Sequence, residues 1–122
     1  VRLTDIYTYD EMIEDLIYFE QTYPDQVKLE IIGKSEWGTE IPVMRIGNEN
    51  ARKHVLLHGS IHGREHFTTW TLMATADYWL DRNLASYGDV CYHIIPMSNP
   101  DGVCISQSGL LDAMQSKQVK TL

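Results

Sequence analysis

The chain has little positive charge and no long apolar run. Its 122 residues carry 17 acidic and 10 basic side chains, a formal net charge of −7. Nucleic acids and anionic membranes select the opposite balance, so neither is expected as a partner. The longest apolar run is a few residues, far short of the roughly 20 that span a bilayer. No basic and apolar leader opens the sequence, so we expect no signal peptide, and the compartment stays open.

What remains is the composition of one globular domain. Hydrophobic residues make up 43% of the chain and charged residues 22%, which excludes a disordered tail or a collagen-like repeat. The length also fits a single domain. Only two cysteines are present, Cys91 and Cys104, and they form no CxxC motif. We expect two free buried thiols rather than a disulfide.

The order of predicted elements indicates an α/β chain. Thr8 and Glu11 have the spacing of a capping box, which predicts a helix that starts after Thr8 and stops before Pro24. Its predicted apolar face consists of Met12, Ile13, Leu16, Ile17 and Phe19. The alternation over 27–33 and the run 41–46 predict a hairpin. Pro42 should lie on an edge or among the first residues of its strand.

The second half of the chain has the pattern of a strand–helix–strand unit. The apolar runs 54–58 and 90–97 predict strands covered on both faces, and a helical pattern lies between them over 65–84. Such a unit predicts a parallel pair with a right-handed crossover. We therefore expect a mixed sheet. The segment Asn99-Pro100-Asp101-Gly102 indicates a turn, and periodicity is lost after it.

Segment 58–66 is the richest in metal-binding side chains, with three histidines and one glutamate. It follows a predicted strand and precedes a predicted helix, at the edge where open α/β sheets bind ligands. Imidazole nitrogens and carboxylate oxygens are both zinc donors. His62 and Glu65 are three residues apart, so both can project to one side of a first helical turn. An HxxE pair also arises easily by chance, so its position is the stronger signal.

Two other interpretations of this segment stay open. His62, Glu65 and His66 also match H-x-x-E-H, the inverzincin motif, in which both histidines bind zinc and the glutamate is the general base. That motif belongs within a helix, whereas Gly59 and Gly63 favour a loop. The plainest interpretation makes His62 and Glu65 a loop residue and a helix-start residue without a ligand.

The neighbouring polar residues have simpler expected roles. His58 at the end of its strand is expected to form a hydrogen bond rather than to bind a metal. His54 and His93 lie within strand patterns and are expected to be structural. Arg64 on a surface loop would ordinarily be solvated.

Several motifs in the same order resemble the carboxypeptidase A-type zinc metallocarboxypeptidases, peptidase family M14. They are Ser60-Ile61-His62-Gly63-Arg64-Glu65-His66, the helix and hairpin segments 7–12, 23–24 and 32–42, and Asn99-Pro100-Asp101-Gly102. The resemblance covers about residues 7–104. It implies the N-terminal part of a mixed-sheet, three-layer α/β/α metallocarboxypeptidase fold of the phosphorylase/hydrolase-like kind.

The resemblance also implies zinc-dependent hydrolysis of a peptide substrate. In that family His62 and Glu65 would be two of the three protein ligands of a catalytic Zn²⁺, and Arg64 would lie near the carbonyl or carboxylate of the substrate. Zinc lowers the pKa of its bound water and polarises the scissile carbonyl. The amino-acid sequence of residues 99–109 is similar to that of bacterial members that cut γ-D-glutamyl-diaminopimelate bonds in cell-wall peptides.

The family's third zinc ligand, catalytic glutamate and specificity residues have no match in this sequence. We therefore expect residues 1–122 to form an incomplete peptidase domain that holds no catalytic residue and is inactive alone. A truncated sheet is expected to expose apolar surface and to self-associate. The alternative is a non-catalytic binding module on the same fold.

Overall fold

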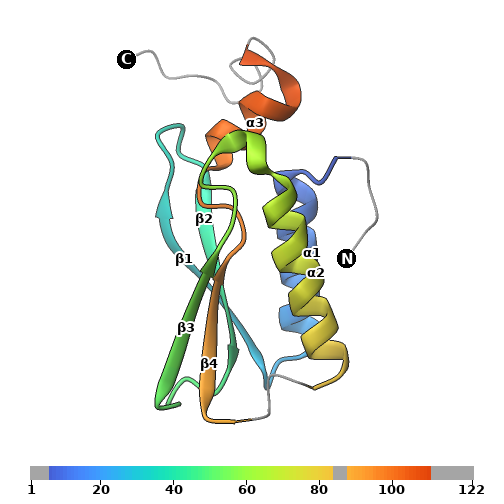
Figure 1. Cartoon of the computed structure of the whole chain (residues 1–122), viewed down its shortest axis with the longest axis vertical. Coiled ribbons are helices and arrows are strands. Elements are labelled where there is room, and N and C mark those ends of the chain that lie inside the picture. The colour runs from blue at the N-terminus through green and yellow to red at the C-terminus, as the bar shows by residue number, and fades with distance from the viewer. Residues whose placement is uncertain (1–5, 84–87, 111–122) are drawn as a thin grey trace.

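One mixed β-sheet lies beside two long helices in the computed structural model (Figure 1), which describes residues 6–83 and 88–110. The elements in chain order are α1 (Tyr9–Thr22), β1 (Val27–Lys34), β2 (Glu40–Gly47), β3 (Lys53–His58), the 3₁₀ turn η1 (Gly63–Glu65), α2 (Phe67–Asp81), β4 (Val90–Ile95) and α3 (Pro100–Ser108). This is the expected α/β architecture. Within the described ranges, no helix is long and apolar enough to cross a membrane.

The sheet has the strand order β1-β2-β4-β3. β1 pairs with β2 and β2 with β4 in antiparallel fashion, whereas β3 and β4 are parallel. The hairpin and the parallel pair joined through α2 are both confirmed. Pro42 pairs with Ile31 of β1 and precedes residues 44–47, which pair with β4. It therefore lies where β2 has only one neighbour, a position that tolerates proline.

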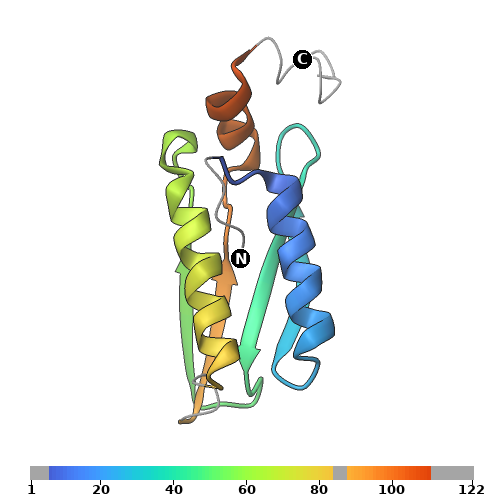
Figure 2. The ribbon, with the colours of Figure 1, turned by 90° about the vertical axis from the view of Figure 1, so that its right-hand side faces the viewer.

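Both long helices pack on the same face of the sheet (Figures 1 and 2). The core between the two layers includes Met12, Leu16, Phe19, Met44, Ile46, Met73, Ala76, Leu80 and Ile94. Side chains alternate along a strand, so the intervening residues of β2 and β4 face away from the helices. Within residues 6–83 and 88–110 no helix covers that second face. The described residues thus supply two of the three layers that the resemblance implies.

Helix α1 starts where the capping box predicts. The Thr8 hydroxyl accepts from the N–H of Glu11 (3.3 Å), and the Glu11 carboxylate accepts from the N–H of Thr8 (2.9 Å). These bonds satisfy donors that a helix start leaves open. The helix ends at Thr22, two residues before Pro24. Its predicted apolar face is wrong at Ile17, which is exposed.

The surroundings of β3 differ from the prediction. The apolar run predicts a strand covered on both faces, but β3 is the last strand of the described sheet and Leu56 is 61% exposed. The predicted helix over 65–84 is also shorter, because η1 precedes α2 and α2 ends at Asp81. Residues 84–87 lie outside the described ranges.

The segment from Asn99 to Gly102 starts a helix and not a turn. Asn99 caps α3 by accepting from the N–H of Gly102 (2.9 Å), and Pro100 takes the first helical position. A missing N–H is harmless there, because that donor has no helical partner. Asparagine and proline favour turns and helix starts alike, so the sequence pattern does not separate the two. Residues 111–122 lie outside the described ranges.

Candidate metal centre

The loop that leaves the carboxyl end of β3 carries the predicted metal ligands. Gly59 donates its N–H to the carbonyl of Ile95 (3.0 Å), and its carbonyl accepts from the N–H of Ser98 (2.9 Å). A Cβ on Gly59 would lie 2.7 Å from the carbonyl oxygen of Pro96. Only glycine permits so close an approach. The loop is thereby held against the segment that follows β4.

Ser60 turns this loop in a left-handed conformation, with φ at 52°. Such a conformation is strained for a residue with a side chain. Its N–H donates to the Thr68 hydroxyl (2.7 Å), and its own hydroxyl lies 2.6 Å from that of Thr69. The Thr69 hydroxyl donates in turn to the carbonyl of Pro96 (2.8 Å). These bonds offset the strain and fix the first turn of α2 to the loop.

Helix α3 supports the loop from another side. The Asn99 amide donates to the carbonyl of Ile61 (3.2 Å) while its oxygen caps the helix. Gly63 and Gly102 lie back to back, because a Cβ on Gly63 would be 2.2 Å from the carbonyl carbon and oxygen of Gly102. The loop backbone between Ile61 and Glu65 therefore rests directly on the backbone of α3.

Asp101 joins α3 to the turn between β1 and β2. One carboxylate oxygen accepts from the hydroxyls of Ser35 (2.8 Å) and Thr39 (3.3 Å). The other oxygen accepts from the backbone N–H of Trp37 (3.0 Å). A single side chain thus connects the hairpin turn to α3, the helix that packs against the loop of His62 and Glu65.

His62 and Glu65 meet on the exposed side of this loop. The N–H of Glu65 donates to the carbonyl of His62 (3.0 Å), which closes η1. Nδ1 of His62 lies 3.1 Å from a Glu65 carboxylate oxygen, and the side chains are 75% and 57% exposed. Two ligand atoms of a tetrahedral zinc ion lie roughly 3.3 Å apart, given bonds of about 2.0–2.2 Å. The two atoms, which form a hydrogen bond here, therefore lie at about the separation of two ligand atoms of one ion.

Arg64 and His66 do not join this pair. Arg64 is exposed and forms no ion pair with another described residue. His66 ends η1 and starts α2. Among the described residues, His62, Glu65 and His66 do not form a three-ligand group. Within the described residues, this loop thus brings together two candidate metal ligands and no third.

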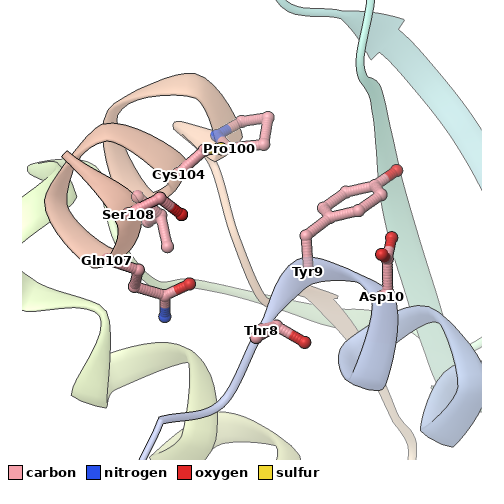
Figure 3. Close-up of a pocket in the computed structure, with 8 residues that line it drawn as sticks. Thr8, Tyr9, Asp10, Pro100, Cys104, Gln107 and Ser108 are labelled. Atoms are coloured by element: carbon pink, nitrogen blue, oxygen red, sulfur yellow. The ribbon is translucent and has the colours of Figure 1, made fainter. Parts of the chain in front are cut away.

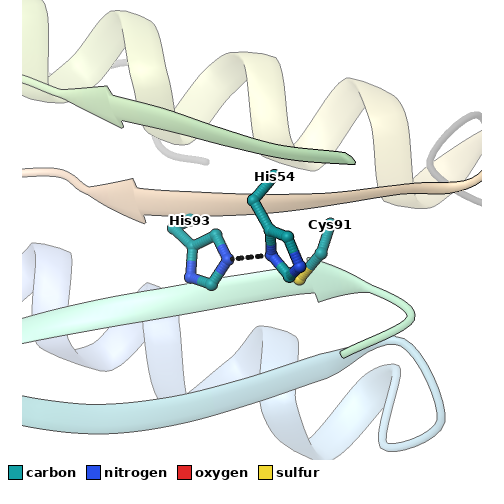
Figure 4. A group of neighbouring side chains, drawn as sticks. All are labelled: His54, Cys91 and His93. Atoms are coloured by element: carbon teal, nitrogen blue, oxygen red, sulfur yellow. Dashed lines mark hydrogen bonds between the residues drawn. The ribbon is translucent and has the colours of Figure 1, made fainter. Parts of the chain in front are cut away.

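The remaining histidines form hydrogen bonds. Nδ1 of His58 lies 3.3 Å from the Ser98 hydroxyl, as expected for a strand-end residue. Nδ1 of His54 lies 2.8 Å from Nε2 of His93, and Cys91 completes a cluster with them (Figure 4). The sequence did not predict this cluster, because neither strand's sequence determines by itself how β3 and β4 pair.

Both cysteines are free, as expected, although only Cys91 is buried and Cys104 is half-buried. Burial is the main cause that raises the pKa of the Cys91 thiol. Burial also lowers the pKa of His93, and the neighbouring His54 and Arg45 lower it further. The His93 imidazole is therefore neutral at neutral pH.

A hollow of about 320 Å³ lies between the start of α1 and one side of α3 (Figure 3). It is lined by Thr8, Tyr9, Asp10, Pro100, Val103, Cys104, Gln107 and Ser108. Gln107 also donates to the carbonyl of Tyr7 (2.9 Å). None of His62, Arg64 and Glu65 lines this hollow, so it is separate from the metal loop.

The sequence is similar to a family of known proteins. A family described as zinc carboxypeptidase matches residues 12–121. Carboxypeptidase B of Astacus astacus is 29% identical over 107 residues, which cover 81% of this chain and 34% of that protein. A zinc carboxypeptidase of Simulium vittatum is 29% identical over 104 residues, which cover 79% of this chain and 33% of that protein. The chain thus spans about a third of the length of these relatives.

Solved structures agree on the fold. Carboxypeptidase A from Helicoverpa armigera superposes with a TM-score of 0.74 at 26% identity, over 92% of this chain and 29% of that one. Bovine thrombin-activatable fibrinolysis inhibitor, solved in complex with tick carboxypeptidase inhibitor, superposes with a TM-score of 0.68 over 83% of this chain and 33% of that one. At 19% identity the second likeness supports the fold alone.

The contact between Gly63 and Gly102 predicts a large effect of one methyl group. We expect Gly63→Ala to lower the free energy of unfolding by about 3 kcal/mol, because its Cβ would overlap the backbone of α3. The matched control is Gly33→Ala, whose Cβ meets nothing within 4 Å. That control should change stability by no more than about 0.5 kcal/mol. Equal midpoints of the two variants in urea would contradict the packing described here.

Proposed function

Because the chain belongs to the zinc carboxypeptidase family, we propose that it supplies the first two zinc ligands of a metallocarboxypeptidase-type peptide hydrolase. His62 and Glu65 are the proposed ligands, and Arg64 is the proposed substrate-binding residue. The substrate class is a peptide with a free terminal carboxylate, consistent with the carboxypeptidases among the relatives.

The observation that carries this proposal is the proximity of the two donors. An exposed imidazole nitrogen and an exposed carboxylate oxygen lie 3.1 Å apart, on a loop whose backbone is held from both sides. A surface pair of this kind contributes little to stability, at most about 1 kcal/mol. The small stabilisation from this pair therefore does not explain why so many contacts hold the backbone of its loop. A pair of metal ligands that must keep a fixed geometry does explain these contacts.

The chemistry divides between the ion and the side chains. When bound, zinc supplies a water of lowered pKa and polarises a carbonyl. His62 and Glu65 hold the ion, and the neutral imidazole and ionised carboxylate are the forms that do so. Arg64 lies between them in the sequence and is exposed, so its guanidinium is available to pair with a substrate carboxylate.

We also propose that this chain is the N-terminal part of a longer peptidase domain. Two ligands leave a zinc ion short of the three that catalytic sites use. The spans of the relatives, three times as long, support the same conclusion. The third ligand and the catalytic glutamate would then come from residues beyond this sequence, and the isolated chain would bind zinc weakly and lack turnover.

The ligand assignment predicts a residue-specific response to zinc. Addition of Zn²⁺ should shift the ring resonances of His62 in NMR spectra, because its imidazole becomes a ligand. Glu65→Gln should weaken that response at least about tenfold, the scale of effects seen even for residues outside the ligand set. Glu36→Gln, which removes another exposed carboxylate, should leave it unchanged.

Two further variants separate the alternatives. Arg64→Gln should not alter zinc binding, since Arg64 faces substrate and not the ion. A loss of the His62 response in His66→Ala would instead support the H-x-x-E-H interpretation. No response in the unaltered chain at millimolar zinc would contradict the proposed ligand pair and favour a binding module.

The incomplete ligand set predicts a lack of activity. The 122-residue chain with zinc should not cleave a blocked dipeptide with a free carboxylate faster than zinc in buffer does. A γ-D-glutamyl-diaminopimelate peptide, the substrate type of the bacterial members, should also remain intact. Turnover of either peptide that Glu65→Gln abolishes would show that the chain is catalytically complete.

We further propose that the chain self-associates through the outer strands of its sheet and through the sheet face that no described helix covers. β1 and β3 are the outer strands of the described sheet, and Leu56 of β3 and Ile32 of β1 expose apolar side chains. Unpaired strand edges with apolar side chains are ready to pair with another copy. The surface therefore has both the backbone donors and the apolar area that association needs.

Sedimentation velocity at rising concentration tests this proposal. The unaltered chain should show a concentration-dependent increase in sedimentation coefficient, and Leu56→Lys should shift the equilibrium toward the monomer. Ile17→Lys changes an exposed apolar residue on the helical side and serves as the control. A monomer at all concentrations would contradict the proposal.

A further inference from the structure

The uncovered face of the sheet carries three metal-binding side chains at one place. His54 lies on β3, and Cys91 and His93 lie on β4. We propose that these three residues form a second metal site, with Zn²⁺ as its ion, distinct from the loop of His62. This inference does not rest on the proposed peptidase function.

The strand register brings the three residues together. In the parallel pair of β3 and β4, His54 lies opposite Cys91, and His93 lies two residues further along β4. Successive side chains of a strand alternate between faces, so Cys91 and His93 share one face. Ile94 belongs to the core beneath the helices, which places the cysteine and both histidines on the opposite face.

The distances suit one small cation. Nδ1 of His54 lies 2.8 Å from Nε2 of His93, and these nitrogens and the Cys91 sulfur all lie within 4.8 Å of one another. In a tetrahedral zinc site, bonds of about 2.05 Å to nitrogen and 2.3 Å to sulfur place the ligand atoms roughly 3.3–3.6 Å apart. Small side-chain rotations would therefore bring the three atoms to ligand geometry (Figure 4).

The donor set selects the type of ion. A thiolate and two imidazoles suit zinc, whereas magnesium and calcium prefer oxygen ligands. Three protein ligands leave a fourth position for water or an external ligand. His54 is exposed and Cys91 is buried, so an ion would reach the sulfur past the imidazole of His54.

Charges around the cluster partly oppose a cation. Arg45 and Glu49 line the same hollow as His93, and Arg45 is ion-paired with Glu30. That pairing reduces the repulsion between the guanidinium and a bound ion. Burial also raises the pKa of Cys91, so the ion must displace the thiol proton. Zinc commonly deprotonates cysteine in proteins, and the neutral His93 is already in its ligand form.

The two sites lie at opposite ends of β3. His54 is near the amino end of the strand and His62 follows its carboxyl end. The four residue-to-residue steps from His54 to His58 span about 13 Å. The sites share no residue, and only the proposed second site contains sulfur. A probe that reports on a thiolate ligand therefore distinguishes them.

Cobalt(II), a spectroscopically visible substitute for zinc, supplies that probe. Titration of Co²⁺ into the 122-residue chain under reducing, anaerobic conditions should give a thiolate-to-cobalt charge-transfer band, and added Zn²⁺ should remove it. Cys91→Ser should abolish the band. Cys104→Ser, which removes the other thiol, should leave it intact. His62→Ala should also leave it intact, because that residue belongs to the other site.

A second pair of variants guards against a folding defect in Cys91→Ser. His54→Gln alters an exposed side chain and should weaken cobalt binding at least about tenfold with an unchanged circular dichroism spectrum. His58→Gln, on the same strand and face, is the matched control and should bind cobalt normally. Absence of the band in the unaltered chain, its survival in Cys91→Ser, or equal affinity of the two glutamine variants would overturn the proposal.

Discussion

The backbone contact between Gly63 and Gly102 is the constraint on which the candidate site depends. Two segments separated by the whole of α2 and β4 approach so closely that a Cβ on Gly63 would overlap the backbone of Gly102. Asn99 reinforces the contact by bonding to the carbonyl of Ile61. Asp101, in the first turn of the same helix, extends it to the β1–β2 turn. The loop, the helix and the hairpin thus form one connected support.

This support explains how two exposed side chains can keep a defined relation. His62 and Glu65 have little packing of their own, and their side chains would otherwise lose considerable rotamer freedom on meeting. The order is supplied by the backbone instead. η1 sets their spacing, Ser60 turns the chain into it, and the hydroxyls of Thr68 and Thr69 fix the start of α2. In the proposed zinc site, preorganisation of this kind would spare the loop a change of conformation when the ion binds.

The sequence predicts local features, such as helix caps and hairpins, better than it predicts which elements pack around a given strand. The capping box of Thr8 and Glu11, the hairpin, and the parallel pair around α2 depend on neighbouring residues, and all are present. β3 is apolar enough to read as a buried strand, yet whether a strand is covered depends on elements elsewhere in the chain. The start of α3 was missed because its asparagine and proline suit a turn equally well.

The two candidate metal sites show the same difference between local and long-range features. His62 and Glu65 lie three residues apart, so their pairing could be predicted from spacing and from the motif around them. His54 and His93 are separated by a helix, and only the pairing of two strands makes them neighbours. No pattern within either strand specifies that pairing. A strand register is decided by which apolar side chains reach the core.

Because core packing sets the strand register, it also sets the position of the His54–Cys91–His93 cluster. A slip of β4 by one residue would turn Ile94 toward solvent and His93 toward the helices, so packing alone excludes it. The polar cluster therefore inherits its geometry from residues on the reverse side of the same strand. A substitution at His54 would therefore remove one proposed ligand and leave in place the core packing that aligns the three positions.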